Sequence, residues 1–133
     1  MAAQTVDIAH LRQWIGRTET VRDLITPRLV AGLRATLDQE PGDPKNGDVA
    51  PLAVHWCLAP PTVTSSQTGP DGHPKRGGFL PPVPLPRRMW AGGELMLHDS
   101  LRVGDDVERR SRIANVELKQ GSEIVLIPKI GGG

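Results

Sequence analysis

The sequence has little of what would assign it to several common protein classes. It contains one cysteine, Cys57, which excludes an internal disulfide and suits a reducing compartment. Its 16 basic and 15 acidic side chains leave a formal net charge of only +1. Without a strong positive field, we expect no binding to nucleic acid or to an anionic membrane surface.

Long apolar runs and metal-binding spacings are also missing. No apolar stretch approaches the roughly 18 residues of a membrane-spanning helix, and the N-terminal residues MAAQTVDIAH lack the basic and apolar regions of a signal peptide. The 4 histidines and the single cysteine show no zinc-site spacing, and no glycine pair leads into the lysine of a phosphate-binding loop. We therefore expect a cytoplasmic protein without a membrane segment, a metal or a cofactor.

The length and apolar pattern are those of one small α+β domain over residues 1–133. Apolar residues recur at helical spacing over Ile8–Ile15, where Asp7 or Thr5 is placed to cap the helix and Gly16 to end it. Thr26 followed by Pro27 is typical of a helix start. These patterns predict a short first helix and a second helix over Pro27–Asp38.

Strand signals lie mainly in the second half of the chain. Thr18–Ile25 fits either a short strand or a turn, and the proline-bounded run Leu52–Leu58 predicts a buried strand. A proline- and glycine-rich loop at about 59–86 follows, of the length seen in lids and binding loops. Further strands are expected over Glu94–His98, Leu101–Val103, Val107–Leu118 with a bulge near Ala114–Asn115, and Ile124–Ile127, with a hairpin turn at Lys119–Ser122 and an end at Pro128.

Two blocks of sequence carry a resemblance to a known family. Pro86–Gly93, PRRMWAGG, and His98–Asp105, HDSLRVGD, resemble the N-terminal half of the MaoC-like double hot-dog dehydratases and hydratases. Within that family the chain is most similar to mesaconyl-CoA (3-methylfumaryl-CoA) hydratases and 3-hydroxyacyl-thioester dehydratases, from about Trp14 to Ser122. The resemblance implies a single hot-dog fold, in which an antiparallel sheet wraps around one central helix, here Pro27–Asp38.

The same resemblance implies an acid–base motif of the form D-x-N-P-x-H just past the central helix. Asp38 and Pro41 fall at its first and fourth positions, whereas Glu40 replaces the asparagine and Asp43 the histidine. Either this half lacks the acid–base pair, or these residues are simply a polar helix exit. We therefore assign no catalytic residue to this chain.

The resemblance also indicates residues that bind substrate. An arginine and an aromatic ring suit the phosphates and adenine of coenzyme A, and a histidine–tryptophan pair lines the space between the two halves of family members. The simpler alternatives are a hydrogen-bonded core histidine and a solvated face of mixed charge. The candidate substrate-binding residues are His55, Trp56, Arg87, Arg88, Trp90, Gly92 and Gly93.

The expected function follows from the family. It is hydration or dehydration of an α,β-unsaturated or 3-hydroxyacyl thioester of coenzyme A or a carrier protein, with 3-methylfumaryl-CoA as the first candidate. This chain would be the N-terminal half without the acid–base pair, in a homodimer or in a heterodimer with a catalytic hot-dog half. The alternative is a non-catalytic hot-dog subunit that self-associates or scaffolds a catalytic partner.

Overall fold

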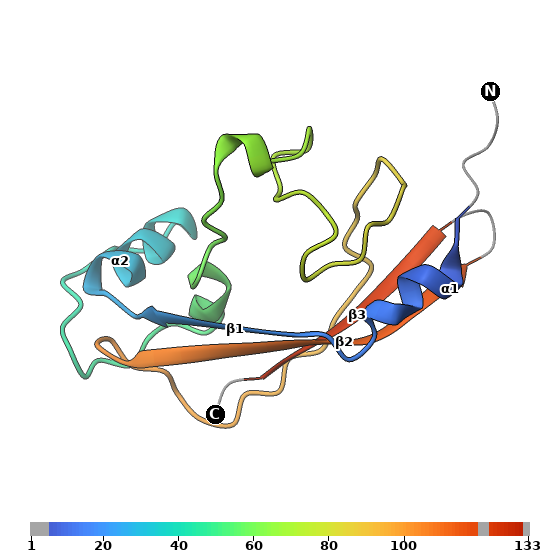
Figure 1. Cartoon of the computed structure of the whole chain (residues 1–133). Helices are drawn as coiled ribbons and strands as arrows, with labels where there is room; N and C mark the ends of the chain where they lie inside the picture. Colours follow the sequence, from blue (N-terminus) through green and yellow to red (C-terminus); the bar gives the residue numbers. More distant parts are fainter. Residues whose placement is uncertain (1–5, 120–122, 132–133) are drawn as a thin grey trace. The chain divides into compact units, whose positions relative to one another are not determined.

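The computed structural model describes residues 6–119 and 123–131, and these residues combine short helices with a sheet that contains an antiparallel pair, β2 and β3 (Figure 1). The expected α+β class is therefore confirmed. In the sheet, β2 lies between β1 and β3. In chain order the elements are α1 (Ile8–Leu11), the 3-10 helix η1 (Arg12–Trp14), β1 (Thr18–Leu24), α2 (Pro27–Thr36), the 3-10 helices η2 (Val54–Cys57) and η3 (Ser65–Gln67), β2 (Asp106–Lys119) and β3 (Glu123–Gly131).

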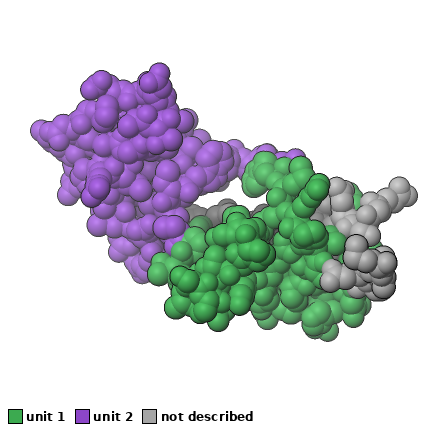
Figure 2. Space-filling model, turned by 90° about the horizontal axis from the view of Figure 1, so that it is seen from above, with its two compact units in different colours: residues 1–20, 61–90, 109–133 green, residues 21–60, 91–108 purple. Residues whose placement is uncertain are grey.

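The chain divides into two compact units, coloured separately in Figure 2. Unit 1 comprises residues 1–20, 61–90 and 109–133, and unit 2 comprises residues 21–60 and 91–108. Each unit has an apolar core of its own. The described residues include no helix long and apolar enough to cross a bilayer, and no group of three or more side chains placed to hold a metal ion.

Unit 1 is built where α1 and η1 pack beside β2. Asp7 begins α1 because its Oδ1 accepts a hydrogen bond from the His10 backbone N–H at 3.1 Å. Gly16 then turns the chain toward β1 with φ +88°, a left-handed conformation that glycine adopts without a steric penalty. Leu11, Ile113 and Val116 are the buried apolar side chains of this core. The helix and its end at Gly16 are confirmed.

Unit 2 is organised around α2. The Thr26 hydroxyl accepts a hydrogen bond from the Leu29 N–H at 3.1 Å, and Pro27 occupies the first turn, as the sequence predicts. Val30 is completely buried in a core that also contains Ile25. Among helices and strands, α2 packs against η2. The predicted helix is confirmed, although it ends at Thr36, whereas its enclosure by a sheet is not.

The pairing of β2 with β3 follows the predicted pattern in one respect and departs from it in another. The register shifts between Ile113 and Asn115, which confirms the bulge predicted near Ala114–Asn115. The prediction that Pro128 ends the last strand is wrong, because β3 continues to Gly131. Within the described sheet β3 is an edge strand, where a residue without an N–H is tolerated. Gln120–Ser122, the centre of the predicted hairpin turn, lie outside the described residues.

Three strand predictions need correction or qualification. Leu52–Leu58 contains the 3-10 helix η2, which starts after Ala53 turns into the left-handed region with φ +71°. Leu101–Val103 contributes only an isolated bridge, from Arg102 to Val49. Glu94–His98 has no regular secondary structure. A strand needs a neighbour to hydrogen-bond with, and the described residues supply none there. By contrast, Thr18–Ile25 resolves into β1, and the 59–86 loop is confirmed except for the short η3.

Candidate functional site

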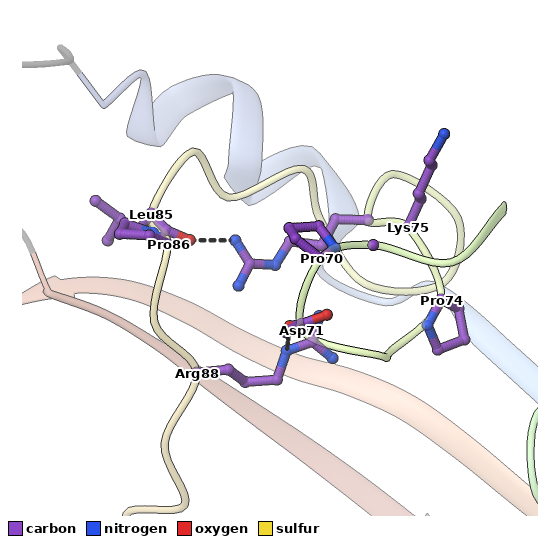
Figure 3. Close-up of a pocket in the computed structure, with 9 residues that line it drawn as sticks. Pro70, Asp71, Pro74, Lys75, Leu85, Pro86 and Arg88 are labelled. Carbon is purple, nitrogen blue, oxygen red and sulfur yellow. Dashed lines mark hydrogen bonds and ion pairs between the residues drawn. The ribbon is translucent and has the colours of Figure 1, made fainter. Parts of the chain in front are cut away.

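A pocket of about 220 Å³ lies in unit 1 between two stretches of loop, 69–76 and 85–88 (Figure 3). Here the proline-rich segment 81–90, which carries the predicted arginines and which we call the arm, meets the preceding loop. Charged side chains of both signs line it together with prolines. The lining residues are Gly69, Pro70, Asp71, Pro74, Lys75, Arg76, Leu85, Pro86 and Arg88.

One wall of the pocket is a tight turn that its sequence favours. Pro70 fixes φ at the second position of the turn, and Gly72 takes φ +79° at its end. The Gly72 N–H donates to the Gly69 carbonyl at 3.1 Å, and the Gly69 N–H donates to the His73 carbonyl at 2.7 Å. Asp71 is thereby held at the tip of the turn.

Asp71 connects this turn to the arm. Its carboxylate accepts a hydrogen bond from the His73 N–H at 3.0 Å and lies 3.6 Å from Nε of Arg88 (Figure 3). The His73 N–H is the main cause that lowers the pKa of Asp71 below its ordinary value; desolvation partly opposes it, and the nearby Arg88 charge makes a smaller lowering contribution. The carboxylate therefore stays ionised at neutral pH and holds Arg88 near the turn.

Arg76 fastens the arm at a second point. Its Nη1 donates to the Val83 carbonyl at 2.6 Å and to the Leu85 carbonyl. The residues that follow these carbonyls are prolines, so every second residue in this part of the arm lacks an N–H with which a strand would pair. A guanidinium presents several donors in a rigid fork, which suits two carbonyls on an extended chain. Arg76 thus links the loop to the arm, and we call these two hydrogen bonds the Arg76 clasp.

Arg76 and Arg88 are occupied in holding the arm, so a ligand would have to meet other side chains. Arg87 is exposed and forms no hydrogen bond or ion pair with the described residues, and Trp90 is 80% exposed three residues later. Lys75 points away from the Asp71–Arg88 pair (Figure 3). Arg88 is already paired with Asp71. Of the predicted phosphate-binding residues, Arg87 and Trp90 are free to meet a ligand, and Arg88 positions the arm.

In unit 2, η2 carries the predicted histidine–tryptophan pair. The ring centroids of His55 and Trp56 are 5.2 Å apart, and Trp56 is largely exposed. Nε2 of His55 is buried and has no hydrogen-bond partner among the described residues. A buried polar atom without a partner costs free energy. The alternative of a fully hydrogen-bonded core histidine therefore does not describe His55 in this structure.

The predicted residues do not form one cluster within a unit. Arg87, Arg88 and Trp90 belong to unit 1, whereas His55, Trp56, Gly92 and Gly93 belong to unit 2. A Cβ at Gly92 would meet no described atom within 4 Å, so the structure shows no close approach of the backbone that requires glycine there.

A second pocket, of about 520 Å³, lies along α2 in unit 2. Leucines from one face of the helix and the free thiol of Cys57 on η2 line it, so it is mainly apolar. Its lining residues are Thr26, Arg28, Leu29, Gly32, Leu33, Thr36 and Cys57.

The stretch compared above with an acid–base motif has the geometry of a helix C-terminus. Asp38 has φ +58°, and its N–H donates to the Ala35 carbonyl at 3.1 Å. The Gln39 N–H donates to the Arg34 carbonyl at 2.9 Å, which completes the usual left-handed helix ending. Glu40 and Asp43 are exposed. This geometry favours the polar helix exit.

Sequence reasoning missed Asp71 and Arg76. The Pro70–Gly72 turn is visible in the sequence and was predicted as part of the loop. What the sequence does not show is that the turn faces the arm, so Asp71 could not be matched to Arg88. The only signal for Arg76 is the run of carbonyls that precede prolines, which need a donor from elsewhere.

Comparison with known proteins shows which proteins this chain is similar to. Residues 53–130 match the family model of hydroxyacyl-thioester dehydratase type 2. The chain is also similar to a mesaconyl-C(4)-CoA hydratase from Chloroflexus aurantiacus, with 43% identity over 108 residues. That similarity covers 81% of this chain and 39% of the relative, so the chain spans well under half the length of the protein it matches.

Proposed function

Because the chain belongs to the hydroxyacyl-thioester dehydratase type 2 family, we propose that it is the substrate-binding half of a hydratase that acts on an α,β-unsaturated coenzyme A thioester. Mesaconyl-CoA is the first candidate substrate. The observation that carries the proposal is the 43% identity over 108 residues to a mesaconyl-C(4)-CoA hydratase. The fold that accompanies it is a single hot-dog domain over residues 1–133 with α2 as its central helix.

Hydration of such a thioester adds a hydroxyl group to the β-carbon and a proton to the α-carbon. It needs a base to activate water, an acid to protonate carbon, and donors for the charge that develops on the thioester oxygen. The exposed helix exit around Asp38 supports none of these roles. We therefore assign the proton-transfer groups to sequence outside the matched region, which makes up most of the relative.

In this proposal the chain contributes binding. Arg87 meets a phosphate of coenzyme A, and Trp90 stacks on its adenine, because both side chains are exposed and the described residues give the cation no partner. His55 and Trp56 contribute to the acyl pocket, where a polar substrate group supplies the partner that Nε2 of His55 lacks among the described residues. Gly92 and Gly93 give the following segment room to adjust.

The first test is turnover with and without a catalytic partner. We expect the purified chain to show no hydration of mesaconyl-CoA, as followed by loss of the enoyl-thioester absorbance and by product mass. Turnover is expected on adding a polypeptide that carries the D-x-N-P-x-H pattern, with an unchanged kcat when this chain carries Asp38→Ala. Turnover by the chain alone that Asp38→Ala abolishes would show that the helix exit is catalytic after all.

The second test concerns Arg87 in that assembled enzyme. Arg87→Met should raise the KM for mesaconyl-CoA at least about tenfold with little change in kcat, because a charge-assisted hydrogen bond to phosphate is worth roughly 1.5–3 kcal/mol and is made in ground and transition states alike. The KM for the mesaconyl-pantetheine thioester, which lacks the phosphates, should not change.

Arg12→Met is the matched control for this test, since Arg12 is also an exposed arginine of unit 1. It removes the same charge from η1 instead of from the arm. If both variants raised the KM for mesaconyl-CoA equally, net charge would be responsible and the assignment of Arg87 would fail.

A further inference from the structure

Two residues of α2 do not suit a helix. Gly32 lies in its interior, where glycine is unfavourable because it has the most backbone freedom to lose. Arg28 lies in its first turn, where the helix macrodipole opposes a positive charge, and that turn contains no acidic residue. Both residues line the apolar pocket of about 520 Å³ in unit 2, which we call the α2 pocket. Residues that break a local rule are expected at functional sites.

The packing of the chain gives no reason for the glycine. Outside the helix itself, a Cβ at Gly32 would meet no described atom within 4 Å. An alanine would therefore fit the chain without strain, and it would add a methyl group to the wall of the α2 pocket. The glycine leaves free a space that no described residue fills.

Arg28 is the one charged side chain among the residues that line the α2 pocket. It is exposed, and it forms no hydrogen bond or ion pair with the described residues. The two hydroxyls of the lining are already engaged, because Thr26 accepts from the Leu29 N–H and Thr36 donates to the Gly32 carbonyl at 2.9 Å. The pocket therefore offers a single unpaired positive charge in a largely apolar setting.

This lining selects a ligand with a small apolar body and one anionic end. Binding sites for small molecules usually combine apolar walls with a few polar groups, in volumes of roughly 300–1,000 Å³. An acyl thioester of a dicarboxylic acid has both features, because a free carboxylate ends the carbon chain away from the sulfur. A guanidinium binds such a carboxylate through two parallel hydrogen bonds. A monocarboxylic acyl thioester has no group for Arg28.

We propose that the α2 pocket binds the acyl part of a dicarboxylic acyl thioester, with Arg28 on its free carboxylate and Gly32 leaving room for its carbon chain. Arg28 then selects dicarboxylic over monocarboxylic acyl groups. The substrate class in this assignment rests on the proposed function. The location agrees with it, since the 3-10 helix that carries His55 and Trp56 also supplies Cys57 to the wall of the pocket.

Cys57 allows the pocket to be probed in the purified chain, because it is the only cysteine and lines the α2 pocket. The rate of its alkylation by iodoacetamide, followed by mass, reports occupancy. The probe is the amide analogue of mesaconyl-pantetheine, which cannot exchange with the thiol. We expect it to slow alkylation, whereas the 3-methylcrotonyl analogue, with a methyl group in place of the carboxylate, should protect much less. Equal protection by the two analogues, or protection by neither, would overturn the proposal.

Arg28→Met should remove the difference between the two analogues. The concentration of the mesaconyl analogue that gives half-maximal protection should rise at least about tenfold, because a charge-assisted pair is lost. Arg34→Met is the matched control: it removes the same charge from the same helix, but Arg34 donates to the Pro41 carbonyl and does not line the pocket. Equal loss of protection in both variants would make the charge of the helix responsible and exclude a specific role of Arg28.

Gly32→Ala tests the space in the pocket. Alanine favours the helix, so the urea concentration at the midpoint of unfolding should rise, while protection of Cys57 by the mesaconyl analogue should weaken. A substitution that merely damaged the fold would lower both stability and binding. Unchanged protection in a stabilised variant would show that the ligand does not use the space at Gly32, and would contradict that part of the proposal.

Kinetics of the assembled enzyme separate Arg28 from the coenzyme site. Arg28→Met should lower kcat/KM for mesaconyl-CoA and for mesaconyl-pantetheine by the same factor, because both carry the carboxylate, whereas Arg87→Met should affect mesaconyl-CoA alone. A loss confined to mesaconyl-CoA would place Arg28 on the coenzyme and overturn the assignment. If no assembly hydrated mesaconyl thioesters, the proposed function would fail, and the alkylation assay would still decide what the α2 pocket binds.

Discussion

Replacing Ile25 with alanine is expected to lower the free energy of unfolding by about 3 kcal/mol, within the range of roughly 2–5 kcal/mol seen for buried isoleucines. Ile25 has no exposed surface and lies in the core of unit 2. Its backbone N–H donates to the Asp105 carbonyl at 3.0 Å, and its carbonyl accepts from Gly104 at 2.7 Å. Alanine keeps these hydrogen bonds, so the loss reports packing alone. Urea unfolding followed by tryptophan fluorescence measures it.

The neighbouring residue provides the control. Leu24 is 50% exposed at the end of β1, so Leu24→Ala removes a comparable side chain from a site with far less burial. A change within about 0.5 kcal/mol is expected there, as for most surface substitutions. Similar losses from the two substitutions would mean that the core of unit 2 is not centred on Ile25.

Local signals allowed several elements to be predicted from the sequence. Asp7 and Thr26 cap helices because their side-chain oxygens reach N–H groups only three residues away, which depends on nothing else in the fold. The bulge at Ala114–Asn115 was visible because the alternation of buried residues changes phase there. Each of these features is encoded within a few residues.

The two mistaken strands show where local signals stop. A short apolar run such as Leu52–Leu58 has the same composition in a strand and in a helical turn. Here Ala53 adopts a left-handed conformation, and a 3-10 helix follows it in place of a strand. In Glu94–His98 the alternation is genuine, but a strand forms only where a partner offers hydrogen bonds. Sequence can indicate that a segment suits a sheet without indicating which polypeptide completes it.

The candidate site was predicted in part for the same reason. The arginine–tryptophan block was found by its sequence, and the structure leaves Arg87 and Trp90 exposed on the arm as a ligand contact requires. The partners that hold the arm lie earlier along the proline-rich loop: Arg76 is 7 residues from Val83 and 9 from Leu85, and Asp71 is farther still from Arg88. Such pairings depend on how the loop folds back, which no local pattern specifies.

Arg76→Met is expected to lower the free energy of unfolding by about 2 kcal/mol, because it leaves two carbonyls without the charged donor they share. Methionine keeps much of the apolar stem of the side chain, so the loss is mainly that of the hydrogen bonds to the Val83 and Leu85 carbonyls. Hydrogen exchange should also become faster in the peptide that covers 77–90, since the loop no longer holds the arm.

Arg87→Met is the control that distinguishes loss of the Arg76 hydrogen bonds from a general effect of removing a charge on stability. It is the same substitution on the same arm, at an arginine with no hydrogen bond or ion pair to the described residues, so its stability should stay within about 0.5 kcal/mol of the unmodified chain. Together the two variants distinguish the arginine that holds the arm from the one proposed to bind substrate. Equal stability of the two variants would show that the Arg76 clasp does not hold the arm, and the arm would then need another anchor to present Arg87 and Trp90 in a fixed geometry.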